Sequence, residues 1–531
     1  MPSFNLFSSI WLFVFMLSSL STWSMQVNDQ KSRDDINQWC QTTPHPNQCN
    51  YFLGRGPHRA PRHRSDFRMI ALQAAIDNAN EAQGCAKSLG KMCRTNAAKA
   101  VWNDCYTLLN NTVFQLNQTV TGLANNQSSD FDAQTWLSAA FTNLQTCFNG
   151  CVEMNLTDFA NPIKASNLTE MISNGLAINH GFLKPNSASN EADGFPTWVT
   201  RIDRRILATV SLQSLANVTV SQAAGSRFPT IQSALDFAGS IDRKNQRYII
   251  YIKGGVYNEN IDIVNELNNI MFLGDGIRYT IITGNRSVAG GYTTYGSATV
   301  GVEASGFIAR GITFRNTAGP AASQAVALRS SSDLSVFYAC SFEGYQDTLF
   351  AVSQRQFYKL CYISGTVDFI FGNAAVVFQN CIISVRKPLT GQANTITAQG
   401  RGDPFQNTGI SIHNCRVIPA ADLVPVVGSV QTYLGRPWQE YSRTVFMKTY
   451  LDGFVNPKGW LPWGNTDFAF TTLYYGEYGC FGNGSALGNR VNWTGYHPDM
   501  TSTDAQDFTV SGLIAGRMWL PATGVSFIAG L

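Results

Sequence analysis

The sequence predicts an all-β right-handed parallel β-helix in its C-terminal part, preceded by an all-α four-helix bundle. A repeat predicts the β-helix: an aromatic or branched pair is followed by a cysteine at Cys340, Cys361 and Cys381, so the motif recurs after twenty-one and then twenty positions. The β-prone runs after residue 207 are short and recur at a similar interval, which is typical of stacked coils. Before residue 180, single apolar stripes with helical spacing predict the bundle.

The composition limits the classes of protein to which the chain can belong. Its 531 residues exceed what one typical core accommodates, so two or more domains are expected. Only 14% of the residues are charged and the formal net charge is +3, which favours compact β-rich structure over long solvated helices. The sequence contains no basic stripe, so we do not expect it to bind nucleic acid.

The segment 1–24 is interpreted as a signal peptide, because the apolar run 10–17 is followed by serines and other small residues. An uncleaved membrane anchor is the alternative, although the run is short for a bilayer span of about 20 residues. Nine N-x-S/T sequons agree with a secretory route. We therefore expect a secreted, extracellular protein that has no membrane association once the signal peptide is removed.

Residues 26–180 are expected to form the antiparallel bundle. Apolar residues step by three and four positions along 69–79, 109–123 and 137–148, and stripes of that width must pack on one another. Residues 181–207 are then a linker, because they are rich in Asn, Ser, Ala and Gly. The linker ends in the dibasic pair Arg204–Arg205, which is interpreted as a processing site; a solvated charge run is the alternative.

Twelve cysteines in a secreted chain are expected to form disulfides, and no CxxC pair or histidine cluster offers a metal site. Cys40 and Cys49 flank a Thr-Pro-His-Pro turn and could close a short hairpin. Cys105 and Cys147 fall within two successive helical stripes and could tie those helices together. Three further cysteines of this half have no assigned partner, and a bridge between the first two would leave the third odd: Cys85, Cys93 and Cys151.

Residues 208–531 are expected to form the β-helix, with one short helix at 231–238. The runs expected as strands before the cysteine-marked units are 217–220, 248–252, 270–273, 281–283, 298–302, 312–314 and 325–328. Parallel strands lie about 4.8 Å apart, within reach of a disulfide. Cys361 and Cys381, one coil apart, are therefore expected to be bridged; free thiols that fill the core are the alternative.

Two carboxylates lie at the centre of this part. Asp347 and Asp368 are twenty-one positions apart, which equals the first cysteine spacing, so both should occupy the same place on neighbouring coils. Like charges so placed raise one pKa unless a cation intervenes, which suits an acid and a nucleophile. Gln324 precedes Gln346 by nearly the same spacing, and Arg436 is held between Gly435 and Pro437. Taken singly, these residues also suit structural roles: a glutamine ladder, turn caps and an arginine stacked on an aromatic ring.

Five segments, in order, resemble the signatures of plant pectin methylesterases. They are Gly255-Val256-Tyr257-Asn258-Glu259, Gln324-Ala325-Val326-Ala327-Leu328, Gly344-Tyr345-Gln346-Asp347-Thr348-Leu349, Gly365-Thr366-Val367-Asp368-Phe369-Ile370-Phe371-Gly372 and Leu434-Gly435-Arg436-Pro437-Trp438. The resemblance covers about 208–531. The helical half resembles the invertase/pectin methylesterase inhibitor domain that precedes many of these enzymes as a pro-region. Its four cysteines at 40, 49, 105 and 147 and the dibasic motif before residue 206 occupy similar positions in that family.

The resemblance implies hydrolysis of the C6 methyl esters of homogalacturonan (pectin) to pectate and methanol. Asp368 matches the nucleophile and Asp347 the general acid, then base. Arg436 matches the group that orients and ionises the nucleophile. The residues matched to oxyanion stabilisation are Gln346 and Gln324. The residues expected to contact substrate are Thr294, Gln324, Arg436 and Trp438, with Phe371 and Tyr345 as further rings that could stack on sugar faces.

The expected partners are methylesterified pectin, pectin methylesterase inhibitor proteins and a processing protease. No cofactor or metal is implied, and we expect a monomer in the plant cell wall. A β-helical hydrolase or lyase acting on the same polymer is the alternative enzyme, because paired carboxylates also serve glycosyl transfer. A catalytically inactive wall or inhibitor protein is the alternative without enzymatic activity. A serine esterase is disfavoured, because the sequence has no G-x-S-x-G motif.

Overall fold

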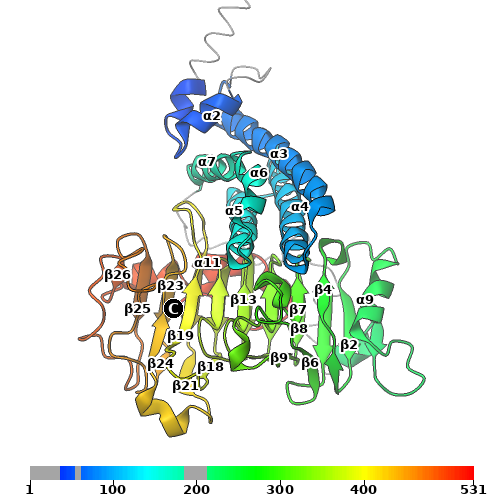
Figure 1. Ribbon diagram of the computed structural model, residues 1–531, viewed down its shortest axis with the longest axis vertical. Coiled ribbons are helices and arrows are strands. Elements are labelled where there is room, and N and C mark those ends of the chain that lie inside the picture. Colours follow the sequence, from blue (N-terminus) through cyan, green and yellow to red (C-terminus); the bar gives the residue numbers. More distant parts are fainter. Residues whose placement is uncertain (1–35, 54–60, 184–211) are drawn as a thin grey trace, which may run out of the picture.

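A computed structural model describes residues 36–53, 61–183 and 212–531. The chain folds into a helical domain that stands on the long side of a β-helix (Figure 1). The predicted signal peptide and the dibasic pair Arg204–Arg205 lie outside the described residues. Within the described ranges, no helix is both long and apolar enough to cross a membrane.

The helical domain is the predicted four-helix bundle. Its long helices are α3 (Arg64–Leu89), α4 (Asn96–Ala124), α5 (Asp130–Glu153) and α7 (Leu168–His180), joined by the short helices α2 (Pro46–Leu53) and α6 (Asn161–Lys164). The first turn of α5 is fixed by a capping box between Ser129 and Asp132, which satisfies backbone N–H groups that a helix start leaves free. The apolar stripes meet in one core that also includes both cystines.

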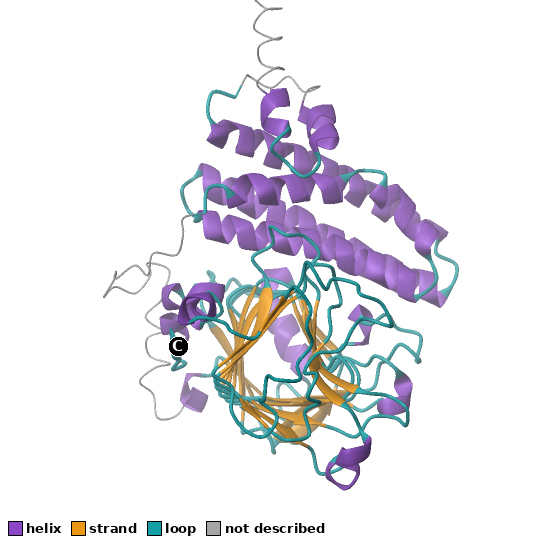
Figure 2. Cartoon of the chain, turned by 90° about the vertical axis from the view of Figure 1, so that its left-hand side faces the viewer, coloured by secondary structure: helices purple, strands orange, loops and turns teal. Residues whose placement is uncertain are grey.

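Three parallel sheets form the β-helix, which Figure 2 shows nearly end-on. The first sheet contains β1 (Val218–Val220), β2 (Tyr248–Ile252), β5 (Ile270–Gly274), β8 (Ile308–Arg310), β11 (Ser335–Tyr338), β14 (Arg355–Lys359), β17 (Ala375–Gln379), β20 (Gly409–His413), β23 (Arg443–Met447), β25 (Tyr474–Tyr478) and β26 (Tyr496–His497). The second sheet contains β4 (Ile261–Ile263), β7 (Val300–Val302), β10 (Leu328–Ser330), β13 (Leu349–Ala351), β16 (Ile370–Gly372), β19 (Asn394–Gln399) and β22 (Thr432–Gly435). The third sheet contains β3 (Gly255–Asn258), β6 (Thr280–Gly284), β9 (Thr313–Asn316), β12 (Ser341–Glu343), β15 (Tyr362–Gly365), β18 (Ile382–Val385), β21 (Arg416–Pro419) and β24 (Tyr450–Leu451).

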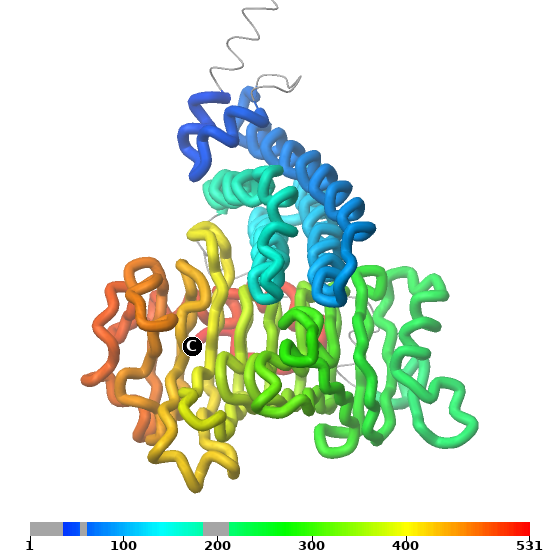
Figure 3. Tube along the Cα trace, viewed as in Figure 1, coloured from blue at the N-terminus to red at the C-terminus, as the bar shows by residue number. Residues whose placement is uncertain are grey.

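Each central coil contributes one strand to each sheet, so residues one repeat apart lie side by side, as the stacked tube in Figure 3 shows. The short helix α9 (Ile231–Gly239) packs against β1, β2 and β4 near the first coil. Two further short helices, α10 (Ser502–Gln506) and α11 (Val510–Ile514), follow the last strand, and α11 packs on β17. The strand expected at 325–328 is displaced, because β10 begins only at Leu328.

The aromatic residues of the repeat form a stack inside the coil. Strand pairing places Phe337 opposite Tyr358 and Tyr358 opposite Phe378. The ring centroids of each neighbouring pair are 4.6 Å apart, with the rings nearly parallel. All three side chains are fully buried, so the repeat in the sequence is the signature of this inward-facing stack.

The predicted bridge between Cys361 and Cys381 is wrong. Both are free, buried thiols. Cys361 Sγ donates to the carbonyl oxygen of Phe337 at 3.3 Å, and Cys381 Sγ donates to that of Tyr358 at 3.6 Å. Each sulfur therefore fills the core and bonds to the backbone of the preceding coil, as in the free-thiol alternative.

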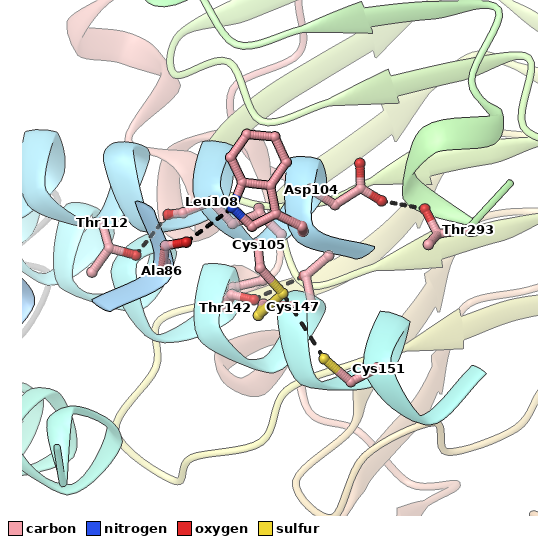
Figure 4. Close-up of a disulfide and its surroundings, with 11 residues drawn as sticks. Ala86, Asp104, Cys105, Leu108, Thr112, Thr142, Cys147, Cys151 and Thr293 are labelled. Atoms are coloured by element: carbon pink, nitrogen blue, oxygen red, sulfur yellow. Dashed lines mark hydrogen bonds between the residues drawn. A yellow bond between two sulfur atoms is a disulfide. The ribbon is translucent and has the colours of Figure 1, made fainter. Parts of the chain in front are cut away.

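The two disulfides predicted in the helical domain are confirmed. Cys40 pairs with Cys49 and Cys105 with Cys147, with Cα separations of 5.5 and 4.7 Å. Cys151 Sγ lies 4.0 Å from Cys105 Sγ and remains a free buried thiol (Figure 4). The remaining cysteines of this half, Cys85 and Cys93, are also free.

We therefore predict eight free thiols in the protein. Unfolding under non-reducing conditions with an alkylating agent should label eight cysteines, and reduction should expose the other four. Intact mass spectrometry counts the labels. Only six labels, with Cys361 and Cys381 both protected, would show that the bridge forms after all.

Candidate active site

The two central aspartates stand side by side on successive coils. Pairing of β13 with β16 places Leu349 opposite Ile370, so the residues two positions earlier, Asp347 and Asp368, are also opposite each other. The Asp347 N–H donates to the carbonyl oxygen of Val367 at 3.0 Å, which continues this register into the turn. The equal spacing in the sequence thus corresponds to equal positions on two coils.

Both aspartates sit in tight turns before their strands. Their φ angles are 60° for Asp347 and 50° for Asp368, a left-handed conformation that Asp tolerates better than most residues. A glycine begins each turn for a steric reason. A Cβ atom on Gly344 would lie 2.7 Å from Thr348 Oγ1, and one on Gly365 would lie 2.3 Å from Phe369 Cβ.

Arg436 distinguishes the two carboxyls, because it binds only Asp368. Its Nε donates to Asp368 Oδ1 at 2.9 Å and to Oδ2 at 3.1 Å, and its Nη2 donates to Oδ2 at 2.6 Å. Charge-assisted, two-pronged hydrogen bonds of this kind are strong and orient the carboxylate plane. The Asp368 side chain is only 8% exposed, so this charge has little water to stabilise it and depends on the guanidinium.

Asp347 has the opposite environment. Within the described part of the chain no group donates a hydrogen bond to its carboxyl, and the residue is buried. Burial raises the pKa of Asp347 well above its usual range, and the charges of Asp368 and Glu153 raise it further, against a smaller lowering by Arg436. Asp347 is therefore the carboxyl of the pair that holds a proton.

Two further residues touch the Asp368–Arg436 pair, and the sequence motifs did not identify either. The Thr395 hydroxyl donates to Asp368 Oδ1 at 2.6 Å. The guanidinium of Arg436 lies over the ring of Trp463, with 4.4 Å between Cζ and the ring centroid. Thr395 lies further along the chain from Asp368 than one repeat, a spacing that the equal intervals of the aspartates and cysteines could not reveal.

The two glutamines lie beside the aspartates without being in exact register. The Ala325 N–H donates to the carbonyl oxygen of Gln346 at 3.3 Å, so Gln324 stands one position before the residue opposite Gln346. Both glutamine side chains are partly exposed. They flank the Asp347 turn on two successive coils.

Aromatic side chains form an apolar surface next to the aspartates. Phe350 stacks on Phe371 with 4.2 Å between centroids, and the Trp438 ring meets both edge-on at 6.2 and 5.8 Å. Tyr345 is not part of this group. Its ring instead packs under the Arg386 guanidinium at 3.8 Å, and its hydroxyl accepts a hydrogen bond from Arg386 Nη2.

Two family models match the chain and divide it as the fold does. The model described as "Pectinesterase" matches residues 217–517, which is more than half of the chain and contains both aspartates. The model described as "Plant invertase/pectin methylesterase inhibitor" matches residues 34–178. The chain belongs to the pectinesterase family. It is a pectin methylesterase with an inhibitor-type helical domain on the same polypeptide.

Full-length relatives share both parts. "Probable pectinesterase/pectinesterase inhibitor 59" of Arabidopsis thaliana is 52% identical over 517 residues, 95% of each chain. "Pectinesterase 2" of Citrus sinensis is 51% identical over 501 residues, 94% of this chain and 96% of that one. The solved structure "Pectin methylesterase from Carrot" is 51% identical with a TM-score of 0.59, and covers 61% of this chain and 99% of its own.

In this pectinesterase the helical domain covers the aspartate site. The long helices lie across the β-helix (Figure 2), and α5 contacts it along its length, from Trp136 to Glu153. At the end of α5, the Glu153 carboxylate accepts hydrogen bonds from the N–H and the hydroxyl of Thr294, a predicted substrate contact. On α4, Asp104 accepts a hydrogen bond from the neighbouring Thr293 hydroxyl (Figure 4).

The apolar surface of the site is covered as well. Phe350 and Phe371 are only 2% and 3% exposed and belong to the same continuous apolar cluster as the core of the bundle. An ion pair supports the contact from one side. Arg355 of β14 binds Asp333 and the helical domain's Asp132, both at 2.7 Å. The helical domain therefore covers the apolar surface next to the aspartates.

The Asp104 contact generates a prediction about stability and pH. Burial raises the pKa of Asp104 to about 7, more than the Thr293 hydrogen bond lowers it. The pKa of this carboxyl is 3.8 in the unfolded chain and about 7 in the fold. Ionisation therefore destabilises the fold, and the effect grows as pH rises from 3.8 through 7. Asp104→Asn should therefore match the wild type at pH 4 and melt at a higher temperature at pH 8.

Thermal unfolding of the full chain at both pH values measures this difference. The gain at pH 8 is at most about 4 kcal/mol, because one pKa unit corresponds to about 1.4 kcal/mol. Asp77→Asn, on the exposed surface of α3, controls for the loss of a carboxyl elsewhere in the bundle. A variant that is less stable than the wild type at pH 8 would contradict the assignment.

Proposed function

We propose that Asp368 is the nucleophile and Asp347 the general acid and base of the pectin methylesterase reaction. The observation that carries this proposal is the asymmetry of two carboxyls in register. Asp368 accepts two-pronged hydrogen bonds from Arg436, whereas buried Asp347 has no donor among the described residues and a pKa that burial raises well above its usual range. One is thus poised to attack and the other to give a proton.

The reaction then proceeds in two balanced steps. An Asp368 oxygen attacks the ester carbonyl carbon at C6 of a galacturonosyl unit, and the bond to the methoxy oxygen breaks as Asp347 gives that oxygen its proton, which releases methanol. Asp347, now a carboxylate, takes a proton from water, and the resulting hydroxide attacks the acyl carbon. The bond to Asp368 breaks, which restores the enzyme and leaves a carboxyl group on the polymer, and this group loses its proton to solvent.

The remaining predicted residues are assigned to transition-state and substrate binding. Gln324 and Gln346 donate amide N–H groups to the oxyanion, and each such donor can contribute about 3 kcal/mol. Trp438 and Phe371 offer ring faces or edges to sugar units, and Thr294 offers its hydroxyl and N–H, which Glu153 occupies in the covered state. Tyr345, engaged by Arg386, is the weakest of these assignments.

The arrangement of the two domains supports a pro-enzyme. We propose that residues 1–24 direct secretion, that the helical domain keeps the site closed, and that a protease cuts the 181–207 linker at Arg204–Arg205. The released enzyme acts as a monomer on methylesterified pectin in the plant cell wall. An inhibitor protein of the same helical type would occupy the surface that the helical domain covers.

The nucleophile assignment predicts that Asp368→Asn abolishes methanol release from methylated pectin without loss of fold, because the amide is isosteric and not nucleophilic. Asp347→Asn should lose about 10²- to 10⁴-fold, the usual range for a general acid and base. Methanol and new reducing ends are measured together on the secreted enzyme. Undiminished turnover by Asp368→Asn would refute the assignment, and new reducing ends without methanol would indicate a glycosidase.

The covered site predicts that a chain of residues 208–531 releases methanol faster than the full chain. In the full chain, Glu153→Ala removes the carboxylate bound to Thr294 and should raise turnover. Glu81→Ala, on the exposed surface of α3, is the matched control and should leave turnover unchanged. Equal turnover by the full chain and residues 208–531 would show that the helical domain does not close the site.

A further inference from the structure

The carboxyl of Asp368 accepts hydrogen bonds from two residues, and both follow it in the order of the second sheet. Arg436 approaches from the β22 end, and Thr395 approaches from β19, the next strand of the second sheet. Pairing of β16 with β19 places Ile370 opposite Thr397, so Thr395 stands opposite Asp368. Asp347, Asp368 and Thr395 therefore occupy equivalent positions on three successive coils.

Thr395 Oγ1 makes two hydrogen bonds with the same residue. It accepts from the Asp368 backbone N–H at 2.9 Å and donates to Asp368 Oδ1 at 2.6 Å. Because the N–H occupies an acceptor site of the hydroxyl, its single proton points to the carboxylate. One oxygen atom thus ties the carboxyl of Asp368 to the backbone of the same residue.

The donor is rigid, unlike the arginine. Thr395 is fully buried and β-branched, so its χ1 angle is restricted. The Arg436 side chain is 23% exposed and ends a long chain of rotatable bonds. The guanidinium orients the carboxylate plane, whereas the threonine hydroxyl ties one oxygen, Oδ1, to the backbone of the turn.

We propose that Thr395 is a positioning residue for the nucleophile: its hydroxyl fixes the rotation of the Asp368 carboxyl relative to the bound ester. This inference rests on the proposed role of Asp368. Loss of the hydroxyl leaves Arg436 in place but removes the bond that ties Oδ1 to the backbone, so this oxygen can shift, and errors of about 1 Å in the position of a reacting atom can cost about 100-fold in rate. Substrate binding, which uses other residues, is left unchanged.

A purely structural role for Thr395 predicts a different result. The hydroxyl also satisfies the N–H of Asp368 in a left-handed turn, so its removal should lower stability in either case. Thr449 offers a matched comparison far from the site. Its buried hydroxyl accepts from the Cys415 N–H at 3.2 Å and has two carbonyl acceptors, Met447 at 3.0 Å and Ile412 at 3.1 Å, with no carboxylate among these partners.

The test compares Thr395→Val, Thr395→Ser and Thr449→Val in the secreted enzyme made from the full chain. We expect Thr395→Val to lower kcat for methanol release by about 10- to 100-fold, with KM within about 2-fold of the wild type. Thr395→Ser keeps the hydroxyl and should restore kcat to within about 3-fold. Thr449→Val should lose a similar amount of thermal stability and keep its kcat. If Thr395→Val does not fold, Thr395→Ala replaces it, since this change also removes the hydroxyl.

Three outcomes would overturn the inference. The first is a Thr395→Val kcat within about 2-fold of the wild type while Asp368→Asn is inactive. The second is an equal loss of kcat in Thr449→Val, which would make the effect one of stability. The third is a failure of Thr395→Ser to restore activity. An active Asp368→Asn enzyme would instead overturn the proposed nucleophile, so the two failures are distinguishable.

Discussion

The two-pronged contact from Arg436 to Asp368 is the interaction on which the site depends. The β-helix places two carboxyls at the same position on neighbouring coils, and this symmetry alone would give two equivalent acids that repel each other. The guanidinium removes the equivalence, because it binds one carboxyl and leaves the other buried without a donor among the described residues. The position of the Arg436 guanidinium therefore determines which aspartate is assigned as the nucleophile and which as the acid.

The same site is also the docking surface of the helical domain. Glu153 and Asp104 bring two carboxylates to the threonines beside the aspartates, and the aromatic surface becomes part of the bundle's apolar cluster. Burial raises the pKa of both carboxyls, so charge at the contact disfavours the closed form. Ionisation of these two carboxyls as pH rises therefore weakens the contact between the two domains.

The sequence predicted the elements that repeat. The equal spacing of the aspartates and of the cysteines determined their register, and the helical stripes determined the bundle. The Cys361–Cys381 bridge was predicted wrongly because spacing reveals which residues are neighbours, not whether two neighbouring thiols oxidise; here each one bonds to a backbone carbonyl.

The residues that the sequence did not reveal lie where the repeat is broken or where two domains meet. Thr395 is more than one repeat beyond Asp368 because the connection from β18 to β19 inserts a longer loop, residues 386–393. Asp104 and Glu153 belong to helices far away in the sequence, and only the docked arrangement brings them to Thr293 and Thr294. Contacts across a long loop or between two domains leave no repeating pattern in the sequence.

Trapping of the acyl intermediate tests the central claim most directly. Turnover of methylated pectin by the secreted enzyme is quenched rapidly with hydroxylamine, which attacks an acylated aspartate and leaves a hydroxamate that peptide mass spectrometry can locate. A nucleophile fixed by Arg436 predicts the hydroxamate at Asp368 and none at Asp347. A hydroxamate at Asp347, or on neither aspartate nor the polymer while methanol is released, would contradict this account.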